Sequence, residues 1–227
     1  MIRHATAAGF LFILLCGATL AIAQERRIEV LKEQPPADRI APPIREKLQP
    51  TGWRVLEGED DAICEIWLFQ EVGAAPDFSA TSELQYPFVP GQLMGVIRLP
   101  GRMDDFRQQQ IPRGVYTLRY AQQPVDGNHV GTFPTRDFLL MVKVEDDRQG
   151  EPIPMMRLQE MSAESAGTAH PALLCLLKPA EKAAPQGAIR HDEQHDWWIA
   201  QLPVKAKAGE RTDQIGLSLV VAGFAEE

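Results

Sequence analysis

Residues 112–142 constrain the fold most, because they contain two strand-like runs joined by a polar loop. Their sequence is PRGVYTLRYAQQPVDGNHVGTFPTRDFLLMV. Residues 115–122 contain β-branched and aromatic side chains, which suit a pleated surface, and residues 136–145 form a second strand-like run. Between them, residues 126–128 (Asp-Gly-Asn) form a strong turn signal, since Gly and Asn tolerate positive φ. The segment therefore predicts an antiparallel pair of strands.

Similar strand-like runs recur along the chain between turn-forming residues. The predicted strands are residues 53–57, 62–71, 92–99, 115–122, 136–145, 172–178, 195–202 and 215–224. One short helix is predicted over residues 154–166, from Pro154 at its start and Gly167 after its end. Because few connections resemble helical crossovers, we expect an all-β fold. Its predicted form is an antiparallel β-sandwich, or a flattened barrel, of about eight strands with one short helix.

The N-terminus has the pattern of a secretory signal peptide. Arg3 is followed by an apolar run over residues 9–22, and small residues precede Gln24. We expect cleavage after Ala23, which would export the protein to the periplasm or the extracellular space. The apolar run is shorter than the roughly 20 residues that a transmembrane helix needs, and no later segment is apolar enough to span a membrane.

Residues 24–52 are charged and interrupted by five prolines, which disfavour both helix and sheet. We expect an extended arm or linker that packs along the domain without joining its core. Residues 53–227 are then expected to form a single β domain. The chain has 31 acidic and 23 basic residues, for a formal net charge of −8. Such a charge gives no electrostatic reason to bind nucleic acid or an anionic membrane.

Two cysteines, Cys64 and Cys175, remain after the predicted cleavage. Export to an oxidising compartment permits a disulfide between them. Each cysteine, however, lies in an apolar strand-like run, where a buried free thiol behaves as a small hydrophobe. The sequence leaves both alternatives open.

The loop after the first strand of the 112–142 segment offers the best candidate ligand-binding residues. Asp126, His129, Arg136 and Asp137 would meet at one end of the sandwich, where a carboxylate could orient the imidazole. In the alternative interpretation, Arg136 and Asp137 lie on opposite strand faces, and the loop residues only shape a turn. His170, in the loop before the strand at 172–178, is a further candidate.

Metal binding is a second hypothesis. His129, His170 and a carboxylate such as Asp126 are suitable ligands if the fold brings them together. His191 and His195 have helical spacing, but turn-forming residues around them favour a solvated hairpin loop. Met155, Met156 and Met161 could bind copper(I), yet they suit core packing under the predicted helix. No cofactor is predicted.

The 112–142 segment resembles an uncharacterised family of secreted bacterial β-rich proteins. The shared pattern is Gly-x-Tyr-Thr-Leu-Arg, Asp-Gly-x-His-x-Gly-Thr and Arg-Asp-Phe-Leu-Leu. These elements are residues 114–119, 126–132 and 136–140, and residues 170–171 (His-Pro) also resemble a family position. The shorter Gly-x-Tyr-Thr-Leu piece is similar to transthyretin-like and carboxypeptidase-regulatory-like sandwich modules. The resemblance implies export and a β fold, and it supplies no catalytic residue.

Three functional hypotheses follow. The leading one is an exported, non-enzymatic module that binds a small ligand, a glycan or an envelope protein through the loop end of the domain. The second is a metal-binding protein or metal-dependent enzyme. The third is a structural component of the cell envelope, tethered by residues 24–52.

Overall fold

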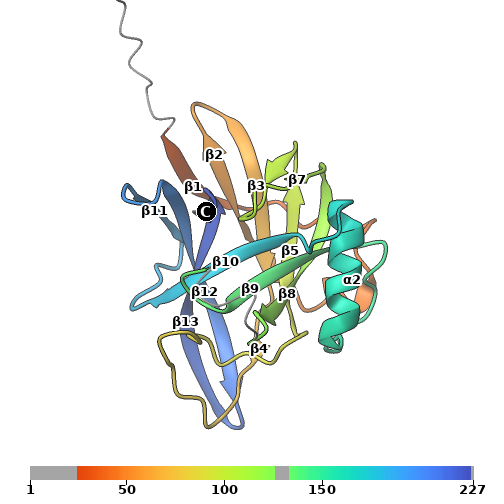
Figure 1. Ribbon diagram of the computed structural model, residues 1–227, viewed down its shortest axis with the longest axis vertical. Coiled ribbons are helices and arrows are strands. Elements are labelled where there is room, and N and C mark those ends of the chain that lie inside the picture. Colours follow the sequence, from red (N-terminus) through yellow and green to blue (C-terminus); the bar gives the residue numbers. More distant parts are fainter. Residues whose placement is uncertain (1–24, 126–132, 226–227) are drawn as a thin grey trace, which may run out of the picture.

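The computed structural model describes residues 25–125 and 133–225, which form a mainly β protein (Figure 1). The prediction of a mainly β fold is confirmed. The described strands are β1 (Arg26–Leu31), β2 (Gly52–Glu57), β3 (Asp61–Leu68), β4 (Val72–Gly73), β5 (Leu93–Leu99), β6 (Met103–Asp104), β7 (Gln110–Ile111), β8 (Gly114–Gln122), β9 (Asp137–Lys143), β10 (Leu173–Ala180), β11 (Ala188–Asp192), β12 (Trp197–Ala208) and β13 (Arg211–Ala222). The helices are α1 (Pro42–Arg45) and α2 (Met155–Ala166). Neither is long and apolar enough to cross a membrane. The predicted signal peptide lies outside the described residues.

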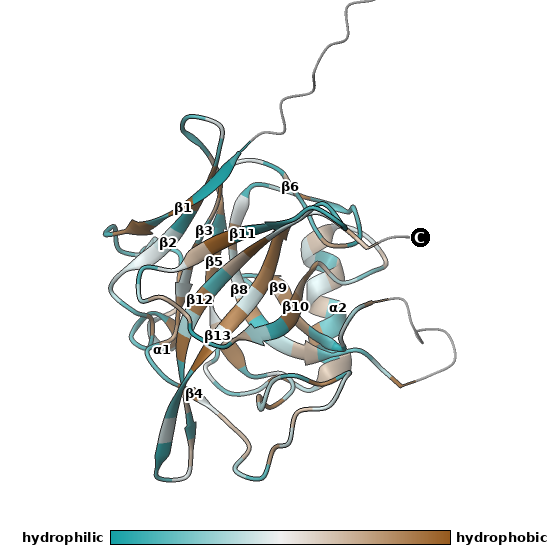
Figure 2. Ribbon diagram, turned by 90° about the vertical axis from the view of Figure 1, so that its left-hand side faces the viewer, coloured by the Kyte–Doolittle hydropathy of each residue, from teal (hydrophilic) through white to brown (hydrophobic). Residues whose placement is uncertain are grey.

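The main sheet is antiparallel and curls into a half-barrel (Figures 1 and 2). Its strand order is β1-β2-β3-β5-β8-β9-β10-β13-β12-β11, and the short β4 pairs with β12 in parallel. The curl brings β1 against β11, and the Arg26 guanidinium lies 5.4 Å from the Trp198 ring centroid. The predicted eight-stranded sandwich is therefore wrong. The twist common to adjacent strands accumulates over ten strands, so one sheet wraps around its own core.

Each of the eight predicted strands has an observed counterpart, and β1, β4, β6, β7 and β11 are additional. Side chains alternate between the two faces of these strands, as the strand period of two requires. In β9, Leu139 and Met141 belong to the core enclosed by the curl. Phe138, Leu140 and Val142 belong to a second apolar cluster on the outer face. Both faces of this part of the sheet are therefore covered.

The N-terminal segment is part of the core, contrary to the expected arm. β1 pairs with β2 from Arg26 opposite Glu57 to Leu31 opposite Gly52. After β1 the chain buries Ile44 and Leu48, which are at most 4% exposed. The indole of Trp67 donates a hydrogen bond to the carbonyl of Glu33 (3.0 Å). The prolines limit regular structure to β1 and the short α1, whose first two residues are Pro42 and Pro43, and the apolar side chains between them pack against the sheet.

Helix α2 forms where the sequence predicted it and covers the outer face of the sheet at β9. Gly167 ends it in the left-handed conformation (φ 72°), which costs a glycine little. Leu158 is fully buried, a burial that stabilises by about 1.5–3 kcal/mol. Ser162 donates to the carbonyl of Ala172 (3.0 Å), and the backbone N–H of Lys143 donates to the Ser165 hydroxyl (2.9 Å). These two bonds fix the helix against β9 and β10.

The segment leading into α2 is held by a buried ion pair between Arg119 of β8 and Asp147. Both side chains are fully buried. The guanidinium donates two bonds to the Asp147 carboxylate, with Nε–Oδ2 2.6 Å and Nη2–Oδ1 2.8 Å. Its other donors reach the carbonyls of Gly91 (2.8 Å), Gln149 (2.6 Å) and Glu151 (2.8 Å). All five donors of the guanidinium are thus satisfied, which is what a buried charge requires.

Candidate ligand-binding groove

The structure separates the two described residues of the predicted loop-end site. Arg136 and Asp137 lie on opposite faces of the sheet, as the alternative interpretation expected. Residues 126–132, which include Asp126 and His129, lie outside the described residues. The convergence of all four, and the distance from His129 to His170, therefore stay predictions.

Asp137 lies on the enclosed side of β9 and is fully buried. Its carboxylate accepts hydrogen bonds from the hydroxyl of Tyr120 (2.5 Å) and from the backbone N–H of Gln85 (2.7 Å). Burial raises the pKa of this carboxyl, and it also raises the pKa of the Tyr120 hydroxyl. The role visible in these contacts is structural: Asp137 attaches the long segment before β5 to the sheet.

Arg136 lies on the outer side and holds the end of β8. Its Nε and Nη2 both donate to the carbonyl of Gln123, at 3.0 and 2.7 Å. The carboxylate of Glu83 is 3.8 Å from Nη1. This guanidinium therefore stabilises the position where the chain leaves β8 and returns into β9.

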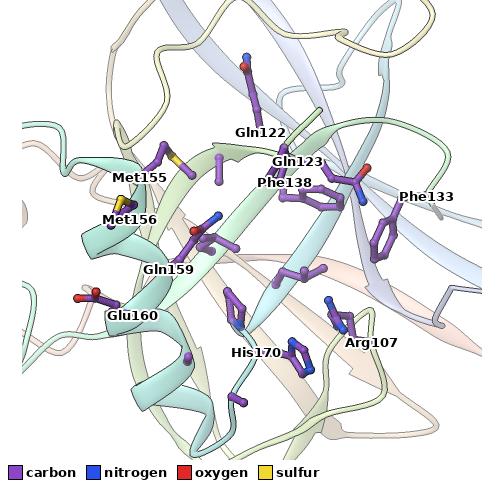
Figure 3. A pocket seen from close by; sticks show the side chains of 17 residues that line it. Arg107, Gln122, Gln123, Phe133, Phe138, Met155, Met156, Gln159, Glu160 and His170 are labelled. Atoms are coloured by element: carbon purple, nitrogen blue, oxygen red, sulfur yellow. The ribbon is translucent and has the colours of Figure 1, made fainter. Parts of the chain in front are cut away.

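A groove of about 540 Å³ lies between α2 and the outer face of β8, β9 and β10 (Figure 3). We call it the α2 groove. Its floor consists of alternate strand residues that share the outer face: Ala121, Phe138, Leu140 and Leu173. Met155, Met156 and Ala163 line it from the helix, and Phe133 and Pro124 from the opposite side. Small-molecule sites have volumes of about 300–1,000 Å³ and predominantly apolar walls. The α2 groove has both properties.

Polar side chains form the rim of the α2 groove. They are Gln122, Gln123, Gln159, Glu160, Arg107 and His170. His170 is thus the one described residue of the predicted site that lies on this groove. The other rim residues were not predicted, because none belongs to a recognisable motif and they come from three separate parts of the chain.

The methionines that were predicted to pack in the core differ in their exposure. Met161 is 6% exposed and packs in the outer cluster, as expected for a core residue. Met156 is 77% exposed on the groove wall, so the core prediction is wrong for it. It occupies the second position of α2.

The two cysteines are free and buried in different clusters. Cys64 belongs to the enclosed core, and Cys175 belongs to the outer cluster beneath α2. Burial raises the pKa of Cys64 to about 12 and that of Cys175 further still. Of the two alternatives left open by the sequence, the structure has buried thiols.

The residues of the 191–195 run lie at the β11–β12 turn. The imidazole of His191 contacts the Asp196 carboxylate (2.7 Å) and stacks on Trp198, with 4.4 Å between ring centroids. His195 stacks in the same way on Trp197, also at 4.4 Å. Within residues 25–125 and 133–225, no group of three or more His, Cys, Asp or Glu side chains is placed to hold a metal ion. The metal hypothesis depends on His129 and Asp126, which those ranges do not include.

Comparisons of the chain with protein-family models, with curated proteins and with solved structures gave no match.

Proposed function

We propose that this protein is an exported, non-enzymatic binding module that takes a small, largely apolar ligand in the α2 groove. One observation carries the proposal: a hollow of about 540 Å³ whose apolar floor has a polar rim. Ligand sites combine these features, since apolar walls provide affinity and a few polar groups fix orientation. Export rests on the predicted signal peptide.

The exposure of an apolar side chain at the groove supports the proposal. Met156, which lines the groove from the first turn of α2, is 77% exposed. An exposed apolar side chain on the wall of an apolar groove, such as Met156, suits a surface that interacts with an apolar partner. Methionine also adapts its shape to different ligands, because its side chain is unbranched and polarisable.

The polar groups of the rim favour binding over catalysis. A general base needs a partner that orients it, as a carboxylate orients histidine in hydrolases. The His170 imidazole has no such partner among the described residues, the Glu160 carboxylate pairs with Arg157 at 3.3 Å, and glutamine amides do not ionise at neutral pH. The rim can donate and accept hydrogen bonds, which is sufficient for recognition.

The test is titration with the neutral, apolar dye N-phenyl-1-naphthylamine, whose fluorescence rises on leaving water. In Ala163→Trp a large side chain fills the groove from α2, and we expect at least a tenfold loss of affinity. Glu164→Trp is the matched control, because Glu164 is exposed on the same helix and does not line the groove. Circular dichroism verifies that both variants fold. Equal affinities in the two variants, or no binding to the wild type, would refute the proposal.

A further inference from the structure

The geometry points to an amphipathic carboxylate as the ligand, with its head group on Arg107 and His170 and its chain on the groove floor. This inference rests on the proposed function, because it assigns a ligand class to the same groove. Figure 3 shows Arg107 and His170 together at the end of the groove that faces away from the first turn of α2. Both side chains are exposed and line the groove.

Arg107 and His170 are available for a ligand. Neither side chain has a hydrogen-bond or ion-pair partner among the described residues. Most of the described arginines are paired instead, including Arg54 with Glu65 (2.8 Å) and Arg119 with Asp147 (2.6 Å). A guanidinium presents its donors as a planar fork that matches a carboxylate, and an imidazole can add a further bond.

Asp105 holds the loop that carries Arg107. This carboxylate is 1% exposed, and its Oδ1 accepts the backbone N–H groups of Arg107 (2.8 Å) and Gln109 (2.9 Å). Its Oδ2 accepts the backbone N–H of Leu173 (3.0 Å), at the start of β10. Gln108, which lies between Arg107 and Gln109, has φ 60°, a conformation that a non-glycine residue adopts only when its surroundings impose it.

Gln109 joins this loop to the loop that carries His170. Its side-chain amide donates to Asp105 Oδ2 (2.9 Å) and to the carbonyl of Pro171 (2.9 Å). Its amide oxygen accepts the hydroxyl of Thr168 (2.5 Å), and that hydroxyl oxygen accepts the backbone N–H of His170 (3.1 Å). The two loops are therefore cross-linked before any ligand arrives. Preorganisation of this kind lowers the entropic cost of binding.

The remaining charge on the rim does not oppose an anion at this end. Glu160 lies on α2, its carboxylate is directed away from His170 in Figure 3, and it pairs with Arg157 at 3.3 Å. The rim otherwise consists of glutamine amides. In a protein of formal net charge −8, an unpaired arginine beside an apolar groove is a local attraction for a negative head group.

The experiment compares three ten-carbon probes below micelle-forming concentrations: decanoate, decanol and decylammonium. Each displaces N-phenyl-1-naphthylamine from the wild type, and the affinities are compared. We expect decanoate to bind about tenfold more tightly than decanol and decylammonium to bind most weakly. The charge-assisted pair favours decanoate, and because solvent at the exposed rim weakens that pair, the expected preference is tenfold, or about 1.4 kcal/mol.

The Arg107→Gln variant is expected to bind decanoate about as weakly as decanol, with the affinity for decanol unchanged. Arg113→Gln is the control, because Arg113 is exposed and does not line the groove. Equal affinities of the wild type for decanoate and decanol would overturn the inference while leaving the proposed function intact. Binding to anionic lipid vesicles without binding of free decanoate would also overturn it. Failure of every probe, including the dye, would instead refute the proposed function.

Discussion

Replacement of Arg119 by methionine tests how much the buried ion pair contributes to stability. Methionine retains the length and much of the apolar volume of the arginine side chain but none of its five donors. The Asp147 carboxylate would then remain fully buried with a single side-chain donor, the Thr117 hydroxyl (2.5 Å). The carbonyls of Gly91, Gln149 and Glu151 would lose the same partner.

Removal of one member of a buried ion pair costs about 3–5 kcal/mol, because the other charge is left uncompensated. With about 4 kcal/mol lost and a urea dependence of about 2 kcal/mol per molar, the unfolding midpoint should fall by about 2 M. That loss is a large share of the roughly 5–15 kcal/mol that stabilises a typical domain.

Urea unfolding followed by tryptophan fluorescence measures the change. Arg113→Met is the matched control, because Arg113 is exposed just before β8. A surface substitution changes stability by no more than about 0.5 kcal/mol, so the unfolding midpoint of this variant should shift by no more than about 0.25 M. A midpoint for Arg119→Met within 0.5 M of the control would refute the reasoning, and the pair would then contribute no more than a surface pair.

Two further predictions concern buried groups. Because burial raises the pKa of Asp137 above its unfolded value, the stability linked to this group is complete below the unfolded pKa and is lost as pH rises through the folded one. The stability of the wild type relative to Asp137→Asn should therefore fall with rising pH in urea titrations from pH 4 to 8, and a constant or rising difference would contradict this. Cys64 and Cys175 are buried free thiols, so a chain without residues 1–23 should react with dithionitrobenzoate only after unfolding and should then release two equivalents without reductant. Zero equivalents would show a disulfide.

The strands could be predicted because their signal is local. In β8 and β9, apolar residues occupy both faces, and both faces are buried. β11 escaped prediction because it lies at the end of the strand order and is only half-buried, so its sequence has no apolar face. β1 escaped for a related reason: its charged residues suggest a solvated arm, although Leu31 is buried. Edge strands lack the pattern on which such predictions depend.

The curl of the sheet could not be predicted, because it depends on pairings between distant residues. β10 is followed in sequence by β11 but pairs with β13, where Leu176 lies opposite Leu219. Nothing in the local sequence of either strand specifies that partner. The α2 groove is non-local in the same way: Arg107 precedes β8, and His170 follows α2. Asp105 and Gln109 bring them to one rim through hydrogen bonds that span more than fifty residues.

Residues 114–119, one of the segments on which the predicted family resemblance rests, make structural contacts. The Tyr116 hydroxyl donates to the carbonyl of Pro112 (2.7 Å), and Thr117 and Arg119 both bind Asp147. These bonds fix residues 147–151, which lead directly into α2, and α2 is one wall of the groove. A segment of this kind determines where a site forms without contacting the ligand. Its polar residues should therefore affect ligand affinity only through stability, whereas Arg107, on the rim, should affect affinity at unchanged stability.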